Sequence, residues 1–124
     1  MNNEIQRIFA GFTVEGNEIP VAFMRYTGKN TTYITYQEIQ DDTPFTADDE
    51  LQAYVRYYDF DIYSKGNYLT IIESVKEILK ANDWRWQPSM TSQDLYEDDT
   101  GYYHKTLCFA KIKNEEIIDT IPSA

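Results

Sequence analysis

The fold is decided by residues 53–82, which read AYVRYYDFDIYSKGNYLTIIESVKEILKAN. Large apolar residues alternate with polar ones in the first half, so Tyr58, Phe60 and Ile62 share one face of a predicted strand. The Ser-Lys-Gly-Asn sequence that follows is typical of a turn, and its Asn67 is a suitable helix N-cap. Apolar residues then recur three and four positions apart, as in an amphipathic helix. This order predicts a helix folded back over a sheet.

The predicted helix is long, and the sequence also indicates its exposed side and its end. Lys76 follows Glu73, and Lys80 follows Glu77, at the three-residue spacing of ion pairs worth ~0.2–0.5 kcal/mol each. Asn82 stands where a left-handed residue commonly ends a helix. The stripe that would pack on the sheet contains Tyr68, Ile71, Ile72, Val75, Ile78 and Leu79.

Shorter elements precede this unit. Residues 3–12 carry isoleucine and phenylalanine at helical spacing and predict a short N-terminal helix. Residues 15–17, Glu-Gly-Asn, are a turn signal. Residues 21–26 predict a strand, and an extended pattern resumes over 31–39 after the turn signal Gly-Lys-Asn at 28–30. We therefore expect these two strands to form a hairpin.

Three further strands are predicted after the long helix. Trp84-Arg85-Trp86 places two tryptophans on one face of a short strand, where core and interface remain alternative roles. Residues 94–97 and 102–111 are joined by the turn 98–101, Asp-Asp-Thr-Gly, and predict a final hairpin.

These elements predict one α+β domain over residues 1–113. Its sheet is expected to be antiparallel, with the long amphipathic helix and the short N-terminal helix packed on one face. Residues 114–124 are expected to form a flexible C-terminal tail. Because isoleucines stand among its acidic residues, this tail either frays or orders against a neighbouring molecule.

The composition favours a protein that is made in a cytoplasm. A single cysteine, Cys108, rules out an internal disulfide and fits a reducing compartment. The sequence shows neither a secretory leader nor an apolar run long enough to span a membrane. We therefore expect no membrane association.

The chain is strongly acidic, with 11 basic and 21 acidic side chains and a formal net charge of −10. Proteins that grip nucleic-acid phosphates need clustered Lys and Arg, so no specific nucleic-acid binding is expected. The charge either serves solubility or forms a surface that repels or imitates DNA. Eleven tyrosines favour either a protein–protein contact surface or the decoration of a sheet.

Acidic residues gather between two predicted strands. Residues 40–50 bury too little apolar surface to order themselves and predict a mobile, solvated loop. The loop is either plainly solvated or faces a partner. Its acidic residues are Asp41, Asp42, Asp48, Asp49 and Glu50.

No active-site motif is found. The acidic turn at 94–99 lacks the ligand spacing of a calcium loop, and Lys105 stands at its twelfth position. His104 and Cys108 lie four residues apart on one predicted strand, ~13 Å from each other, which is too far for a hydrogen bond. No phosphate-binding glycine loop occurs. We therefore expect no catalytic residue, no cofactor and no metal.

Four segments carry a resemblance to a known family. They are YITYQE at 33–38, DIYSK at 61–65, the helix around Val75-Lys76 and, most specifically, DLYEDDTGYYHK at 94–105. In these segments the chain resembles the small tail-completion or tail-terminator proteins encoded in the head–tail joining region of siphophages and prophages of Gram-positive bacteria. The resemblance covers residues 31–111.

The resemblance implies a structural role in the virion tail. Such proteins are α+β subunits of a ring, expected to be a hexamer, that stops growth of the tail tube and offers a docking face to the head connector. The implied partners are further copies of the chain, the major tail tube protein and the head–tail connector. We hypothesise that the acidic residues of 40–50 face the lumen or the tube end. The candidate interface residues are Trp84, Trp86, Tyr96 and Tyr102.

Two other functions fit parts of the sequence. An acidic DNA mimic that inhibits a host protein shares the charge and the length, but a mimic needs carboxylates spread over one long face, and here they bunch into a loop, a turn and a tail. Capture of a host nuclease or polymerase by a monomer would favour the mimic. A cation-dependent hydrolase that uses the acids of 94–99 predicts a higher melting temperature with Mg²⁺ or Mn²⁺.

Overall fold

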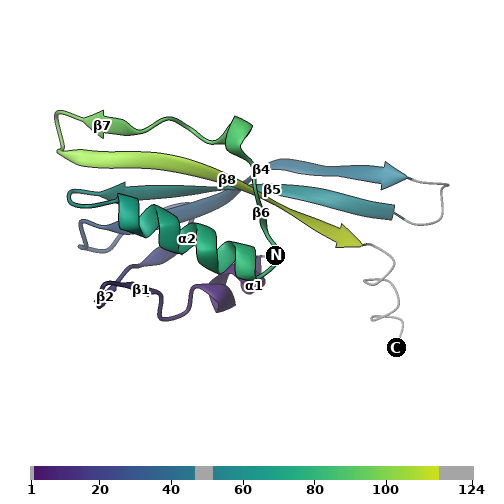
Figure 1. The fold of residues 1–124 in the computed structure, drawn as a ribbon, viewed down its shortest axis with the longest axis horizontal. Helices are drawn as coiled ribbons and strands as arrows, with labels where there is room; N and C mark the ends of the chain where they lie inside the picture. Colours follow the sequence, from purple (N-terminus) through teal and green to yellow (C-terminus); the bar gives the residue numbers. More distant parts are fainter. Residues whose placement is uncertain (1, 47–51, 115–124) are drawn as a thin grey trace.

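The computed structural model describes residues 2–46 and 52–114, which form an α+β domain with two helices and a mixed sheet. Figure 1 shows both helices on one side of the long strands. No helix among the described residues is long and apolar enough to cross a membrane. The elements in chain order are α1 (Asn2–Ile8), β1 (Thr13–Val14), β2 (Asn17–Glu18), β3 (Val21–Phe23), β4 (Tyr33–Thr46), β5 (Gln52–Ser64), α2 (Leu69–Ala81), β6 (Arg85–Trp86), the 3-10 turn η1 (Pro88–Met90), β7 (Leu95–Glu97) and β8 (Tyr102–Asn114).

The main sheet is built around β5. Its strand order is β3-β4-β5-β8-β6, and β7 also pairs with β8. The expected final hairpin is confirmed, since β7 and β8 pair antiparallel across the turn at 98–101. A separate small hairpin, β1–β2, forms at the turn signal of residues 15–17, where Glu15 and Gly16 both have positive φ.

The hydrophobic core lies between the sheet and the helices. Phe60, at the centre of β5, is fully buried, and its neighbours across the sheet are Tyr36 on β4 and Leu107 on β8. Helix α2 contributes the predicted stripe. The buried cluster comprises Ile5, Phe9, Phe12, Val14, Ile19, Ile34, Tyr36, Tyr58, Phe60, Ile62, Ile71, Ile72, Val75, Leu79, Trp84, Leu107 and Phe109.

The expected hairpin between residues 21–26 and 31–39 is wrong, because β3 pairs with β4 in parallel. The chain leaves β3 at Met24, whose φ is 68° and whose N–H donates to the Tyr36 carbonyl oxygen over 2.8 Å. It then returns to the start of β3, where the Ile34 N–H donates to the Pro20 carbonyl oxygen over 2.9 Å. The chain changes direction at Met24, which has a left-handed conformation. The connection that was expected to be a tight turn is therefore a crossover between two parallel strands.

Helix α2 is amphipathic but has only 13 residues, so the expectation of a long helix is not confirmed. It begins at Leu69, so its N-cap is Tyr68, which makes no side-chain cap hydrogen bond, and the expected N-cap Asn67 is one residue too early. Asn67 instead accepts the Leu69 N–H through its side-chain oxygen over 3.1 Å. Asn82 has a φ of −112° and is not left-handed as predicted. Asp83 takes that conformation instead, with a φ of 71°.

The expected loop at 40–50 is also wrong over its first part, because β4 continues to Thr46. Pairing with β5 is kept through two register shifts, between Glu38 and Gln40 and between Gln40 and Thr43. The partner strand, β5, is rich in aromatic and β-branched residues. Its backbone groups pair with those of β4 even though the outer part of β4 has an acidic sequence. The remainder of the predicted loop, residues 47–50, lies outside the described residues.

The outer parts of three strands form what we call the arm, made of β4 from Gln37, β5 up to Tyr57 and β8 from Ala110. Figure 1 shows β4 and β5 continuing along the long axis past both helices. Strand β3 pairs only with Ile34, Thr35 and Tyr36, so the outer edge of β4 has no partner strand in the arm among the described residues.

Candidate interaction surface

The sheet face opposite the helices carries a row of stacked rings, which we call the tyrosine ladder: Tyr26, Tyr33, Tyr63 and His104. Ring centroids lie 4.7 Å apart between Tyr26 and Tyr33, 4.9 Å between Tyr33 and Tyr63, and 4.2 Å between Tyr63 and His104. All four side chains are partly exposed. Stacked, half-exposed aromatic rings offer a rigid apolar surface with polar tips, which suits contact with another protein.

Strand register builds the ladder. Tyr33 pairs directly with Tyr63, and Tyr63 with His104, so one ring from each of three adjacent strands stands in line. Tyr102 closes one side, with its ring edge-on to Tyr33 at 6.1 Å and to Tyr63 at 6.3 Å. The Lys65 ammonium lies 5.1 Å above the Tyr102 ring, within the range of a cation–π contact.

A polar cluster continues the same face beyond the ladder. Asp61 accepts a hydrogen bond from the Thr106 hydroxyl, and its Oδ1 lies 3.3 Å from Nε2 of His104. Burial and the Asp61 carboxylate raise the pKa of the Tyr63 hydroxyl to about 12, so this tyrosine is a neutral hydrogen-bond donor at physiological pH. The face therefore offers both apolar area and oriented polar groups.

Asp59 is the unusual group under this face. Burial first, and the charge of Asp61 second, raise the pKa of its carboxyl to about 6, against a weaker opposing hydrogen bond from Cys108. Its Oδ1 is buried and has no hydrogen-bond partner within the described part of the chain. Burial and Asp59 also raise the pKa of the Cys108 thiol to about 12, which keeps this cysteine protonated and poorly nucleophilic.

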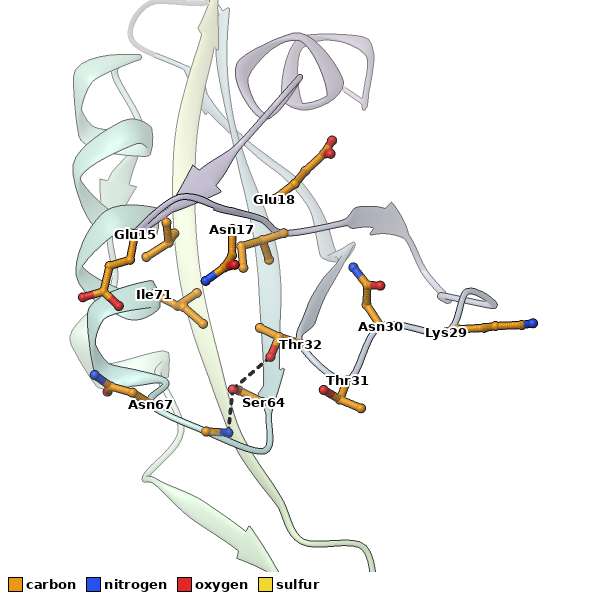
Figure 2. Close-up of a pocket in the computed structure, with 13 residues that line it drawn as sticks. Glu15, Asn17, Glu18, Lys29, Asn30, Thr31, Thr32, Ser64, Asn67 and Ile71 are labelled. Atoms are coloured by element: carbon orange, nitrogen blue, oxygen red, sulfur yellow. Dashed lines mark hydrogen bonds between the residues drawn. The ribbon is translucent and has the colours of Figure 1, made fainter.

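On the helix side, a separate open pocket of about 590 Å³ lies between the β1–β2 hairpin, residues 29–32 and the start of α2 (Figure 2). At its base the Ser64 hydroxyl accepts the Gly66 N–H over 3.0 Å and lies 3.2 Å from the Thr32 hydroxyl. In Figure 2 the charged ends of Glu15, Glu18 and Lys29 point in different directions. The pocket therefore does not bring its ionisable groups to one point.

The four candidate interface residues do not form one patch. Trp84 is only 2% exposed and packs in the core, with its ring edge-on to Tyr58 at 5.6 Å. Trp86 is 39% exposed beneath the Lys76 ammonium, which lies 3.8 Å from its ring centroid. Tyr96, on the edge strand β7, is exposed. Only Tyr102 lies beside the tyrosine ladder.

The five acidic residues that were predicted to face a lumen or a partner are not all within the described structure. Asp41 and Asp42 belong to β4 in the arm, whereas Asp48, Asp49 and Glu50 lie outside the described residues.

In the 94–99 turn, Asp94 forms an ion pair of 2.6 Å with Lys105, and this contact lowers the pKa of its carboxyl. Across residues 2–46 and 52–114, no three His, Cys, Asp or Glu side chains are grouped to hold a metal ion.

Sequence reasoning did not single out Tyr26, Tyr33 or Tyr63. The alternation of side chains along residues 53–63 is the signal that could have found Tyr63, because it puts this residue on the opposite face from Phe60, with Asp59 and Asp61. The missing information was the register, which decides which rings of neighbouring strands meet.

Comparison with known proteins identifies no relative: no family model matches the sequence, and no curated protein matches it. The functional assignment below is therefore built on the sequence resemblance and on the surfaces described here.

Proposed function

We propose that this protein is a tail-completion subunit of a siphophage or prophage, a building block of a ring that caps the tail tube and joins it to the head connector. The observation that carries the proposal is the arm, in which β4 and β5 continue past both helices while still paired with each other. The resemblance over residues 31–111 supplies the class of protein.

The arm has the properties of a surface that another chain covers. Ile39 is 39% exposed and Ile112 is 49% exposed, and both lie beyond the buried cluster. Within residues 2–46 and 52–114, no strand pairs with the outer edge of β4 in the arm, and natural proteins usually cover or pair such an edge. In a head-to-tail ring, each arm would lie against the next copy, and closure of the ring would cover every arm.

The tyrosine ladder supports a second contact on the same subunit. A ring that joins a tube to a connector needs contact surfaces besides those between its own copies. The ladder is rich in tyrosine, the residue type enriched at such interfaces, and lies on the sheet face away from the helices. We assign it to the tube protein or the connector.

The acidity fits a channel that DNA passes through. A net charge of −10 per copy repels phosphates and keeps DNA from adhering to the wall. We place Asp41, Asp42, Asp48, Asp49 and Glu50 toward the lumen or the tube end. A ring seen with these residues on its outer wall would contradict this placement.

The direct test is to assemble the protein with a siphophage tail tube protein and to image the product by electron microscopy. We expect six-fold rings at the tube end, and tubes of uncontrolled length when the gene is deleted. Ile112→Glu in the arm should abolish the rings, whereas Leu69→Glu on α2, at a site that is 58% exposed against 49% for Ile112, should leave them intact. Normal infectious tails after deletion, or capture of a DNA-binding enzyme by a monomer, would refute the proposal.

A further inference from the structure

The tyrosine ladder extends one ring beyond the strands that build it. Strand β3 pairs with β4 only from Ile34 onward, so no described strand lies beside Tyr33 on its outer side. The outermost ring comes instead from the crossover between β3 and β4, residues 24–32, whose Tyr26 stacks on Tyr33 with ring centroids 4.7 Å apart. A connecting segment thus supplies a ring that the sheet itself does not.

The crossover folds around this ring. The Tyr26 side chain lies across Gly28, and its hydroxyl oxygen accepts the Asn30 N–H over 3.0 Å. Two parts of the molecule therefore hold the ring in place, Tyr33 of the sheet and the loop to which Tyr26 itself belongs.

Gly28 is the residue that makes this arrangement possible. A Cβ atom at Gly28 would stand 2.7 Å from Cε1 of the Tyr26 ring and closer still to its Cζ and hydroxyl oxygen, whereas real Cβ contacts essentially never fall below 3.0 Å. The φ of Gly28 is not in the positive range that strains other residues, so an alanine is not excluded by φ. The glycine is therefore needed for the space that it leaves to the ring.

We propose that Gly28 is the positioning residue of the tyrosine ladder, because it lets Tyr26 complete the docking surface before a partner binds. A surface that is already ordered in the free subunit loses less conformational entropy on binding, which raises the affinity. Tyrosine is well suited to such a surface, since its ring has only two χ angles and combines apolar area with a polar tip. This inference rests on the proposed function, in which the ladder contacts the tube protein or the connector.

The first test uses the full chain on its own and compares Gly28→Ala with Gly66→Ala. A Cβ added at Gly66 meets no atom within 4 Å, and the φ of Gly66 is not positive either, so Gly66→Ala is the matched control. NMR spectra of labelled tyrosine rings, assigned with Tyr26→Phe, should show an NOE between Tyr26 and Tyr33 in the wild type and the control, but not in Gly28→Ala. Hydrogen exchange at the Asn30 amide should become about two- to tenfold faster in Gly28→Ala only.

A double variant separates displacement of the ring from damage to the fold. The three atoms nearest to a Cβ at Gly28 all belong to the Tyr26 side chain, whose end can swing away. Gly28→Ala should therefore lower the melting temperature by no more than about 5 °C, and it should not lower it at all in a Tyr26→Ala background. A Tyr26–Tyr33 NOE that persists in Gly28→Ala would refute the proposal. An equal loss of melting temperature in the two backgrounds would also refute it, because the Cβ would then conflict with another group.

The last measurement asks whether the positioned ring serves contact with a partner. Gly28→Ala should still form rings through the arm, but these should bind the ends of siphophage tail tubes, or siphophage head connectors, about tenfold more weakly than Gly66→Ala rings do. Equal binding by the two variants, with the Tyr26 ring released, would overturn the role of Gly28 in docking. Wild-type protein that binds neither partner would refute the proposed function instead, and the NMR comparison would still decide whether Gly28 positions the ring.

Discussion

At the scale of single residues, Asp59 makes the stability of the protein depend on pH. Its folded-state pKa of about 6 lies above the value of about 3.9 for an unfolded aspartate. The folded state therefore binds the proton more tightly, and the stabilisation is fully present below about pH 4 and is lost as the pH rises through 6.

We predict that Asp59→Asn removes this dependence. Relative to the variant, the wild type should lose about 1–3 kcal/mol of unfolding free energy between pH 4 and pH 7. Urea denaturation of both proteins at the two pH values measures the difference. Parallel pH profiles for the two proteins would show that Asp59 titrates normally.

The tyrosine ladder makes a second prediction at this scale. Tyr63 stacks on Tyr33 and His104 at once, so Tyr63→Ala should cost about 2–4 kcal/mol, whereas Tyr63→Phe keeps both ring contacts and should cost less than about 1 kcal/mol. Thermal unfolding gives the comparison. Tyr96→Ala, at a site 53% exposed, is the control and should cost much less than Tyr63→Ala.

At the scale of elements, helix α2 shows what the local sequence determines. The N-cap of α2 is Tyr68, one residue after the predicted Asn67. The apolar stripe of the helix and its packing on the sheet were predicted correctly from the spacing of apolar residues. The end of the helix was not, because Asn82 and Asp83 both tolerate positive φ and only the tertiary structure selects Asp83.

Two leucines of α2 allow a matched test of this packing. Leu79 is fully buried and Leu69 is 58% exposed. Leu79→Ala should destabilise the protein by about 2–5 kcal/mol, and Leu69→Ala by less than about 1 kcal/mol. Chemical denaturation checks both values. Equal effects would mean that the stripe does not face the core as described.

The strands show that the local sequence predicts extended segments but not how they pair. Residues 21–23 and 33–36 were correctly predicted to be extended, but the alternation of side chains is the same in parallel and antiparallel strands. The acidic composition of residues 40–46 predicted a loop, but these residues form a strand that pairs with β5. Which strands pair with each other depends on the whole sheet, so a local sequence pattern does not predict the pairing.

At the scale of the whole molecule, the same limit applies to the candidate surfaces. Trp84 and Trp86 have the same sequence signature, yet one lies in the core and the other is exposed. The tyrosine excess favoured either a contact surface or the decoration of a sheet, and the register of β4, β5 and β8 decides where the rings meet. The contact surface stays a prediction, whereas the fold gives the place of the rings.

Net charge leads to a prediction about assembly. Copies with a charge of −10 repel one another, and salt screens this repulsion with a Debye length of about 30 Å at 0.01 M and about 3 Å at 1 M. Self-association through the arm should therefore increase with NaCl concentration. Analytical ultracentrifugation at both concentrations tests this, with Ile112→Glu as the variant that should remain monomeric. Association that weakens with salt would point to ion pairs as its main source.

The burial of Cys108 has a practical consequence. It is the only thiol in the chain, it is fully buried at the centre of β8, and its high pKa leaves almost no reactive thiolate. A thiol-specific label should therefore attach only while the strands around it are open. At label concentrations high enough for labelling to outpace reclosing, the labelling rate would equal the frequency of that opening, without any engineered probe.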